Sequence, residues 1–338
     1  MHVLADEHSM RGHRALVLGG SGLIGSHAAR SLLARGASVR VLTRDRARCP
    51  DWVGASVELM EGDPASREVL RRALDGCTLV VHAAAPYPRS HWNAESQARA
   101  AEDSIRVFMG AATERTLLGI VFVSSVTTIG PARGRAANED DPFDPTRERS
   151  PYFVMKHRME RVVLEAAMDG APVVVVNPSL TIGAHDRSLT TGRLLIPLAR
   201  GGMPIYLPGV VPTVAARDVG EAIAVALLRG TRGRRYILSN ENYSAAEFLA
   251  RAARVAGVRA PRVSIPLGLA EAVAFASEGV NRLLRRPWPA LPVSGVRMIR
   301  HSQALDPSRA RKELALAETP VEEALREAFD WYRAEGHL

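Results

Sequence analysis

The chain has 338 residues, enough for two domains or for one large α/β unit with a smaller lobe attached. An apolar content of 46% and a charged content of 24% are those of a globular protein with a buried core. The net charge of +8 comes mostly from scattered arginines, and fits either a solvated basic surface or attraction of an anionic cofactor or substrate. No basic run interleaves with aromatic residues, which argues against nucleic-acid binding.

Cys49 and Cys77 show neither a pairing pattern nor metal-ligand spacing. We therefore expect reduced thiols, a cytoplasmic protein and no bound metal. Residues 1–12 are polar and include two acidic residues, which argues against a secretory signal and predicts a flexible tail. No apolar stretch reaches the roughly 18 residues that span a bilayer, so we expect no transmembrane segment.

The first predicted strand covers residues 14–19, and the stretch that overlaps and follows it, VLGGSGLIGS, holds four glycines in seven positions. Gly20, Gly22 and Gly25 match G-x-G-x-x-G, whereas Gly19, Gly22 and Gly25 match the wider G-x-x-G-x-x-G. Glycines between a strand and a helix let backbone amides approach a pyrophosphate. The stretch predicts a dinucleotide loop, and leaves open which triplet is used.

Short apolar, β-branched runs then alternate with amphipathic segments. The predicted strands are 38–43, 56–61, 78–83, 119–125 and 172–177, and the predicted helices are 23–35, 66–75, 94–117 and 151–169. Continuous apolar strands in such alternation indicate a parallel sheet that helices cover on both faces. The fold class is therefore α/β, with a Rossmann-type doubly wound parallel sheet.

After residue 177 the regular alternation fades. Residues 236–240 fit one more strand of the sheet, and a helix from Ser244 to about 255 begins with a capping-box spacing to Glu247. Further helices are expected at 266–286 and 320–336. We expect a dinucleotide-binding domain at 13–178 to which 210–240 returns, and a smaller, mainly helical substrate lobe formed by 179–209 and 241–338.

The second strand ends VLTRDRAR, so Thr43 and Arg44 stand where NAD-binding folds typically carry an acidic residue for the ribose hydroxyl. A guanidinium can pair with a 2′-phosphate, which a carboxylate would repel. The sequence favours NADPH, with NAD still possible. Arg48 is a second candidate contact, and either arginine also fits a solvated surface.

Residues 150–156 read SPYFVMK. Ser150 and Pro151 suit the N-cap and first position of a helix, which puts Tyr152 and Lys156 four residues apart on one helical face. A free tyrosine has a pKa near ~10, and a neighbouring ammonium lowers it toward a useful range. The pair therefore predicts a proton donor and its helper.

Ser124 and Ser125 end a predicted central strand, 27 residues before Tyr152 in the case of Ser125. The carboxyl ends of parallel strands gather around a bound ligand. A serine hydroxyl beside the tyrosine can hold a substrate oxygen while hydride moves. The set indicates hydride transfer coupled to proton transfer.

Taken in order, the glycine loop, EGD at 61–63, VVHAAAP, VFVSSVTTIG at 121–130, YFVMK and NPSLTIG at 177–183 resemble the extended short-chain dehydrogenase/reductase family. The resemblance covers nearly the whole chain and selects the triplet that begins with Gly19. Within the family, PVVVVNPSLTIGAHD and GRRYILSNEN are most similar to the dihydroflavonol-reductase-like branch, which includes hopanoid-associated sugar epimerase-like proteins.

The resemblance implies a role for each matching residue. Tyr152 would be the acid/base, Ser125 rather than Ser124 the catalytic serine, and Lys156 would also hold the nicotinamide ribose. The residues implied for cofactor binding, together with those of the second strand, are Gly19, Ser21, Gly22, Leu23, Ile24, Gly25, Thr43, Arg44, Arg48, Asp63, Ala83, Ala84, Ala85, Tyr152, Lys156, Pro178 and Ser179. One departure is Ala101, where family members often carry a helix asparagine of the proton relay.

Three functions remain: an NADPH-dependent ketone or aldehyde reductase, a nucleotide-sugar epimerase or dehydratase with retained cofactor, and a non-catalytic NADP-binding regulator. The intact Ser125, Tyr152 and Lys156 set disfavours the regulator. Nucleotide-sugar members usually carry a diphosphate-clamping arginine where this chain has Val211. An apolar segment is a poor diphosphate site, because buried phosphate needs charged donors. We therefore expect a fairly hydrophobic carbonyl substrate.

Three aromatic-type residues after the fourth strand are candidates for a substrate wall, or equally for surface packing: Tyr87, His91 and Trp92. The 266–286 helix, with its arginines, fits a packed lobe helix, a route for a lipophilic substrate or a membrane contact. A homodimer through the 94–117 and 151–169 helices is the expectation that the family resemblance implies.

Overall fold

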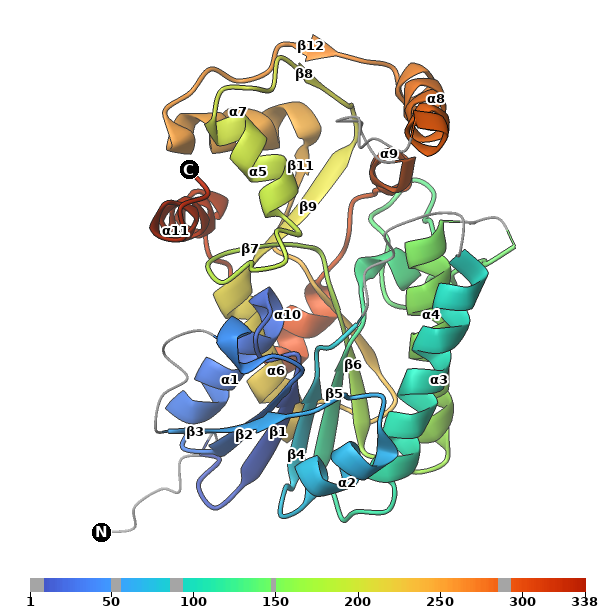
Figure 1. Cartoon of the computed structure of the whole chain (residues 1–338), viewed down its shortest axis with the longest axis vertical. Coiled ribbons are helices and arrows are strands. Elements are labelled where there is room, and N and C mark those ends of the chain that lie inside the picture. The colour runs from blue at the N-terminus through green and yellow to red at the C-terminus, as the bar shows by residue number, and fades with distance from the viewer. Residues whose placement is uncertain (1–8, 50–55, 86–93, 147–149, 285–292) are drawn as a thin grey trace.

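The computed structural model describes residues 9–49, 56–85, 94–146, 150–284 and 293–338. It has two parts: a sheet with helices on both faces, and a smaller lobe above the carboxyl ends of its strands (Figure 1). This is the doubly wound α/β architecture that the alternation of strands and helices predicts.

The large sheet has seven parallel strands in the order β10-β6-β5-β4-β1-β2-β3. Their bounds are β1 (Arg14–Leu18), β2 (Ser38–Thr43), β3 (Val57–Glu61), β4 (Leu79–His82), β5 (Gly119–Val123), β6 (Val173–Pro178) and β10 (Arg235–Leu238). The order reverses direction between β1 and β4. In sheets of this kind a ligand binds at that reversal, outside the carboxyl ends of the strands.

Helices cover the two faces because successive strand residues point to opposite sides. In β1, Ala15 and Val17 join a core under α1 (Leu23–Ala34), α6 (Ala216–Arg229) and α10 (Ser308–Leu314). Leu16 and Leu18 join the opposite core under α2 (Arg67–Leu74), α3 (Ala94–Ala112) and α4 (Pro151–Met168). All four side chains are fully buried, which fixes the strand between the two helical layers.

The smaller lobe holds a three-stranded sheet, β11-β9-β7, and a two-stranded one, β12-β8. Its elements are β7 (Leu180–Ile182), α5 (Gly192–Ala199), β8 (Ile205–Tyr206), β9 (Val210–Ala215), β11 (Glu241–Ser244), α7 (Ala245–Ala256), β12 (Val263–Ser264), α8 (Leu267–Leu284), α9 (Val293–Arg300) and α11 (Val321–Ala334). The helices α5, α7 and α11 share one apolar core with the three-stranded sheet. The predicted capping box of Ser244 and Glu247 at the start of α7 is confirmed.

The packing divides the chain differently from the expected boundaries at three places. Met10 lies in the expected tail, yet its side chain is fully buried in the core of the large sheet. The expected return of 210–240 holds for α6 and β10, whereas β9 pairs with β7 and β11 of the lobe. In the expected lobe segment 241–338, α10 instead packs against α6 and β10.

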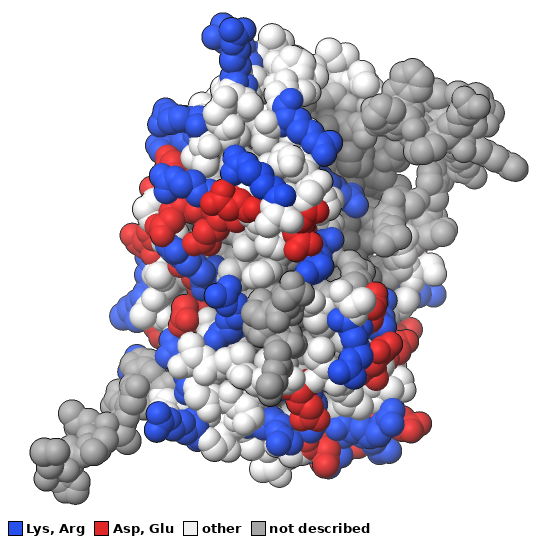
Figure 2. Space-filling view, turned by 60° about the vertical axis from the view of Figure 1, so that its left-hand side comes forward, with Lys and Arg blue, Asp and Glu red and all other residues white. Residues whose placement is uncertain are grey.

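Cationic and anionic side chains stand side by side on the face drawn in Figure 2, with no broad area of one sign. Between α6 and α11, for example, Arg217 pairs with Glu323 at 2.8 Å and with Glu327 at 2.7 Å. Many of the arginine charges are therefore balanced by a neighbouring carboxylate. Among the described helices, none is both long and apolar enough to cross a membrane.

Candidate active site

The glycine loop follows β1 and opens α1, as predicted. Gly19 has a φ of +83°, and a Cβ there would lie 2.9 Å from the backbone of Ala83 and Ala84. A Cβ on Gly25 would lie only 2.2 Å from the carbonyl oxygen of Gly19. At Gly20 the three atoms nearest to a Cβ would all belong to the side chain of Val41. The tightest backbone constraints therefore fall on Gly19 and Gly25, both members of the wider triplet.

The first turn of α1 is open toward this loop. Gly22 is the N-cap residue and provides no side-chain cap, so the first helical amides stay available to an outside acceptor. Ser21, Leu23 and Ile24 are half-buried around it. Free amides and the positive end of the helix dipole suit a diphosphate.

The end of β2 lies beside the loop, in the next strand of the sheet. Thr43 is buried, and its hydroxyl bonds both the amide and the carbonyl of Asp45, at 3.2 and 3.0 Å. Arg44 is exposed. The carboxylate of Asp45 accepts a hydrogen bond from the amide of Ala47 and caps the short helix η1 (Arg46–Arg48). Arg48 belongs to η1, and its side chain lies outside the described part.

Asp63 follows β3, is exposed, and accepts a hydrogen bond from the Ala65 amide at 3.0 Å. Ala83 and Ala84 are half-buried directly after β4, while Ala85 is exposed. All of these positions therefore lie at the carboxyl edge of the sheet, where the resemblance expects the adenosine half of a cofactor.

Several buried hydroxyls near this edge have no hydrogen-bond partner among the described residues, including those of Thr127 and of Ser239, which directly follows β10. Two of them, on Ser124 directly after β5 and on Ser179 directly after Pro178 of β6, lie at the ends of neighbouring strands. An unpartnered buried hydroxyl costs about 1–3 kcal/mol, so such groups are usually satisfied by something outside the chain. Their position next to each other in the sheet order favours a ligand above β5 and β6.

The three catalytic candidates come from two elements that pack together at the carboxyl end of β5, the short helix η2 (Val126–Thr128) and α4. Ser125 is the N-cap of η2, and its hydroxyl accepts a hydrogen bond from the Thr127 amide. Pro151 begins α4 as predicted, and Tyr152 is half-buried in its first turn. The ammonium of Lys156 donates to the Val123 carbonyl at 3.2 Å, two residues before Ser125.

Lys156 is almost fully buried. Loss of water lowers the pKa of its ammonium to about 8, against the opposing effect of the Glu160 carboxylate. His82, at the end of β4, is also buried, and burial together with the Lys156 charge lowers the pKa of its imidazole to about 4. The histidine is therefore neutral at physiological pH, and Lys156 remains the cation of this site.

Glu160 and Asn177 are buried polar residues that the motif-based prediction did not include. The Asn177 amide donates to the Ser125 carbonyl at 3.1 Å and to the Glu160 carboxylate at 2.8 Å. Glu160 lies four residues beyond Lys156, a spacing that could have identified it from the sequence. Asn177 sits in an apolar strand, VVVVN, where a lone polar residue at the carboxyl end is a similar signal.

The predicted substrate residues are placed less directly. Tyr87, His91 and Trp92 lie outside the described residues. Val211 is half-buried in β9, where it pairs with Tyr243 and packs against the apolar core of the lobe. Core packing alone therefore accounts for an apolar residue there, and its contact with substrate stays a prediction. Ala101 is buried in the core between α3 and α4, so it offers no polar group at the place of the expected asparagine.

A hollow of about 450 Å³ lies elsewhere, beside the edge strand β10. Its arginines are each paired with a carboxylate: Arg234 with Glu313, Arg235 with Glu160, and Arg309 with Asp140. Neutralised arginines make a poor anion site. The candidate site is therefore the carboxyl edge of the sheet, where the open helix end, the glycine backbone and the unpartnered serines gather.

These features fit a dinucleotide cofactor. The loop at Gly19 and Gly25 leaves no room for side chains and exposes backbone amides, and the unpartnered hydroxyls of Ser124 and Ser179 lie farther along the same edge. This arrangement offers donors to a diphosphate at one end and polar partners to a nicotinamide at the other.

Comparison with known proteins agrees with this geometry. Residues 15–239 match the NAD dependent epimerase/dehydratase family. A Synechocystis protein provisionally named dihydroflavonol 4-reductase is 31% identical over 95% of each chain. A farnesyl-dihydroquinoline-oxide ketoreductase from Stigmatella aurantiaca is 28% identical over 90% of this chain and 92% of that protein.

Among solved structures, a nucleoside-diphosphate-sugar epimerase from Pseudomonas aeruginosa superimposes with a TM-score of 0.82 at 26% identity, over 97% of this chain and 99% of that one. The match to the family covers well over half of the sequence, including all strands of the large sheet except the first residue of β1. The chain therefore belongs to the NAD dependent epimerase/dehydratase family, the extended short-chain dehydrogenases/reductases, and is an NAD(P)-dependent oxidoreductase.

Proposed function

We propose that this protein reduces a ketone or aldehyde on a fairly hydrophobic small molecule, with NADPH as hydride donor and Tyr152 as proton donor. The observation that supports the proposal is the packing of α4, which carries Tyr152 and Lys156, against η2 at the carboxyl end of β5, where Ser125 caps η2 and Lys156 donates to the Val123 carbonyl. The same edge holds the glycine loop and the unpartnered hydroxyls of Ser124 and Ser179. A reductase needs these groups together, because hydride and proton must reach the two ends of one carbonyl.

Each residue has a distinct task in this reaction. The bound reduced cofactor supplies the hydride to the carbonyl carbon. The hydroxyl of Ser125 donates a hydrogen bond to the carbonyl oxygen and orients it. Tyr152 gives its phenolic proton to that oxygen as negative charge develops there. The Lys156 ammonium offsets the charge left on the phenolate, and its burial strengthens this effect because little water screens it.

The preference for NADPH rests on the end of β2. Arg44 is exposed where a 2′-phosphate would lie, and the neighbouring carboxylate of Asp45 is engaged with the Ala47 amide. A guanidinium favours the phosphate, and no free acidic side chain follows Thr43 directly to hold a ribose diol.

The substrate class rests on charge and on relatives. Val211 stands where nucleotide-sugar enzymes usually carry a diphosphate-clamping arginine, and a diphosphate buried without partners loses several kcal/mol. One relative is named for ketone reduction on a farnesylated ring, which is the same type of reaction on a lipophilic molecule. Both points favour an uncharged, hydrophobic carbonyl compound.

The alternative is a nucleotide-sugar epimerase that keeps its cofactor. The likeness to the Pseudomonas aeruginosa epimerase favours it. Candidate phosphate partners in such an enzyme are Arg187, Arg193 and Arg217. Of these, Arg217 is held by Glu323 and Glu327, and Arg187 lies 3.6 Å from Glu335. These ion pairs weaken the case for a diphosphate site.

Replacing Tyr152 by Phe tests the proposal. The variant keeps the ring that packs against Phe153 and loses only the proton donor. We expect NADPH binding, followed by cofactor fluorescence, to stay within a fewfold of wild type, while kcat falls by about 10²–10⁴-fold. Tyr206→Phe, at a half-buried tyrosine of β8, is the matched control and should retain kcat. Near-normal turnover by Tyr152→Phe would remove this tyrosine from the reaction and overturn the proposal.

A further inference from the structure

Glu160 occupies the same face of α4 as the two catalytic candidates. Tyr152, Lys156 and Glu160 follow at intervals of four residues, which aligns them along one side of the helix. The Glu160 side chain is only 3% exposed. A buried carboxylate is costly unless several donors satisfy it, so its partners indicate what it holds in place.

Two of those partners fix the turn that presents Ser125. The Glu160 carboxylate accepts from the Thr128 hydroxyl and from the Asn177 amide, both at 2.8 Å. The same hydroxyl lies 2.9 Å from the Ser125 carbonyl oxygen, and the same amide lies 3.1 Å from it. The Thr128 hydroxyl has one proton and serves one acceptor at a time. Glu160 thus orients the two side chains that bracket the Ser125 main chain.

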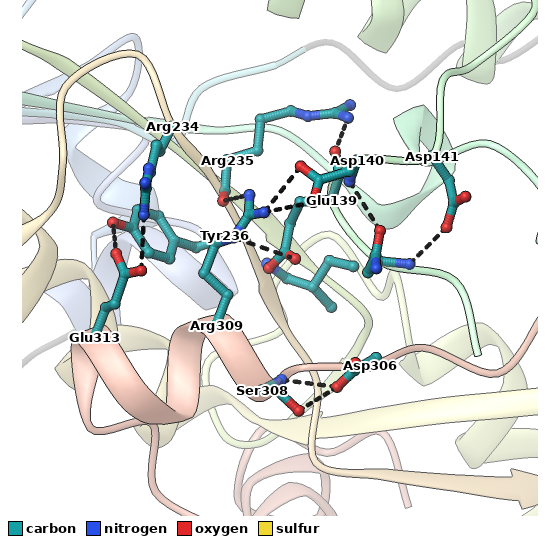
Figure 3. A network of polar contacts seen from close by, with 12 residues as sticks. Glu139, Asp140, Asp141, Arg234, Arg235, Tyr236, Asp306, Ser308, Arg309 and Glu313 are labelled. Carbon is teal, nitrogen blue, oxygen red and sulfur yellow. Dashed lines mark hydrogen bonds and ion pairs between the residues drawn. The ribbon is translucent and has the colours of Figure 1, made fainter. Parts of the chain in front are cut away.

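The opposite side of the carboxylate faces the edge of the sheet. Arg235 of β10 approaches Glu160 at 3.3 Å and also donates to the main-chain carbonyls of Thr128 and Glu139. Figure 3 shows the network that continues outward from Arg235, in which Arg309 pairs with Asp140 at 2.8 Å. Glu160 is therefore held from both sides and has little freedom to move.

We propose that Glu160 is a positioning residue of the candidate active site: its carboxylate fixes the η2 turn that presents Ser125 and keeps a negative charge beside Lys156. The inference rests on the proposed function, since it assigns Glu160 to the same proton-transfer site. Glu160 touches neither substrate nor cofactor in this account and acts through Thr128, Asn177 and Lys156.

The negative charge of Glu160 changes the pKa of Lys156 in a defined direction. The groups around Lys156 are Tyr152 and Glu160 on α4 and the neutral His82 on β4, while Arg235 and His157 lie on the other sides of Glu160. A negative charge favours the protonated lysine, so its removal lowers the pKa of the Lys156 ammonium further. If reduction requires this ammonium, activity is then lost at lower pH than in the wild type.

Glu160→Gln tests both parts, because glutamine keeps the shape of the side chain and loses its charge. We expect kcat at neutral pH to fall about tenfold, and the alkaline limb of the kcat/KM profile to move about one unit toward lower pH. Affinity for NADPH should change far less. A readout without substrate is the ultraviolet titration of Tyr152, taken as the difference between each protein and the same protein carrying Tyr152→Phe. The pH at which Tyr152 ionises should also move toward lower values in Glu160→Gln.

Two further variants distinguish the positioning role of Glu160 from the effect of its charge and from a general loss of stability. Thr128→Val keeps the Glu160 charge and removes the hydroxyl, so kcat should fall while the alkaline limb stays in place. Glu139→Gln removes an equally buried carboxylate, which accepts from the Ile237 amide at 2.8 Å and lies 3.7 Å from Arg309. It should lower the thermal midpoint and leave kcat and the alkaline limb at wild-type values.

The inference is overturned if Glu160→Gln has the wild-type alkaline limb and the wild-type ultraviolet titration, or if Thr128→Val turns over at the wild-type rate. It is also overturned if Glu139→Gln reproduces the effects of Glu160→Gln. If Glu160→Gln does not fold, the kcat of Thr128→Val is the measurement that tests the positioning role. The ultraviolet titration requires no substrate, so it judges Glu160 even where Tyr152→Phe retains turnover and the proposed function itself fails.

Discussion

Arg44 is the residue on which the proposed preference for NADPH rests. It follows the buried Thr43 at the end of β2 and is exposed to solvent. The hydroxyl of Thr43 ties down Asp45, which fixes the backbone on both sides of Arg44 while leaving its side chain free to turn. A guanidinium in this place can form charge-assisted hydrogen bonds with the 2′-phosphate of NADPH. The 2′-hydroxyl of NADH carries no charge and offers no such contact.

Arg44→Ala should therefore weaken NADPH binding and leave NADH binding almost unchanged. A lost charge-assisted contact is worth about 1.5–3 kcal/mol, which is roughly ten- to a hundredfold in affinity. Titrations of both reduced cofactors into both proteins provide the measurement. Arg99→Ala, at an exposed arginine of α3, controls for the loss of one positive charge. Equal affinity of the wild-type protein for NADH and NADPH would defeat the prediction.

At this scale the sequence predicts residues that belong to short motifs, and misses residues that act only in three dimensions. Tyr152 and Lys156 could be found because one helix carries both at a fixed spacing. Asn177 lies 52 residues beyond Ser125, and only the pairing of β5 with β6 brings the two together. Thr128 and Glu160 likewise meet across 32 residues of sequence. Contacts of this kind depend on the register of the sheet, which no motif encodes.

Among the elements, the turn from β1 into α1 is the most constrained. Gly25 lies inside α1, where glycine normally weakens a helix relative to alanine. Here alanine cannot be accommodated, because its Cβ would lie 2.2 Å from the Gly19 carbonyl oxygen, and that contact is with backbone rather than with a flexible side chain. Glycine at position 25 lowers the helix propensity of α1 but allows the start of the helix to pack closely against the loop.

Gly25→Ala should consequently lower the free energy of unfolding by about 1–3 kcal/mol and abolish measurable NADPH binding, because the loop must shift. The matched control is Gly110→Ala, in the last turns of α3, where a Cβ would meet nothing within 4 Å. That substitution should stabilise the protein by about 0.5–1 kcal/mol and leave binding unchanged. Chemical denaturation and cofactor titration of both variants provide the comparison. Wild-type binding by Gly25→Ala would contradict this account of the loop.

The strands of the large sheet were predicted to within a few residues because most of them are continuous apolar runs. The helix expected at 94–117 ends earlier, at Ala112, and the one expected at 266–286 is described up to Leu284. Several elements went unpredicted: α5, α6, α9, α10, β7, β8, β9, β11 and β12. Most of these strands are two to four residues long, too short to show alternation. In α6, residues Ala222 to Leu227 are all buried, so the helix lacks a distinct polar face there.

At the scale of the whole molecule, the lobe stands over the carboxyl edge of the sheet and so over the candidate site (Figure 1). In the proposed account one constant catalytic set acts on whatever substrate the lobe admits, because the set follows β5 and lies on α4 while the lobe comes from β7, β9 and the later helices. The family accordingly includes both reductases and epimerases, and the catalytic residues alone do not distinguish them.

The difference between those two reactions lies in the fate of the cofactor. A reductase oxidises one NADPH for each product molecule, whereas an epimerase returns its cofactor unchanged. A hydrophobic carbonyl compound gains roughly 25 cal/mol per Å² of apolar area that it buries in the lobe. A nucleotide sugar would instead have to remove two phosphate charges from water where Val211 offers no charged donor.

The most direct test is to measure NADPH oxidation and product formation together, with the purified protein, a panel of hydrophobic ketones and aldehydes, and UDP- and dTDP-sugars. We predict that at least one carbonyl compound is reduced with one NADPH consumed per product, that Tyr152→Phe loses this activity, and that the sugar nucleotides are recovered unchanged. Conversion of a sugar nucleotide with no net consumption of NADPH would contradict the account and establish the epimerase alternative.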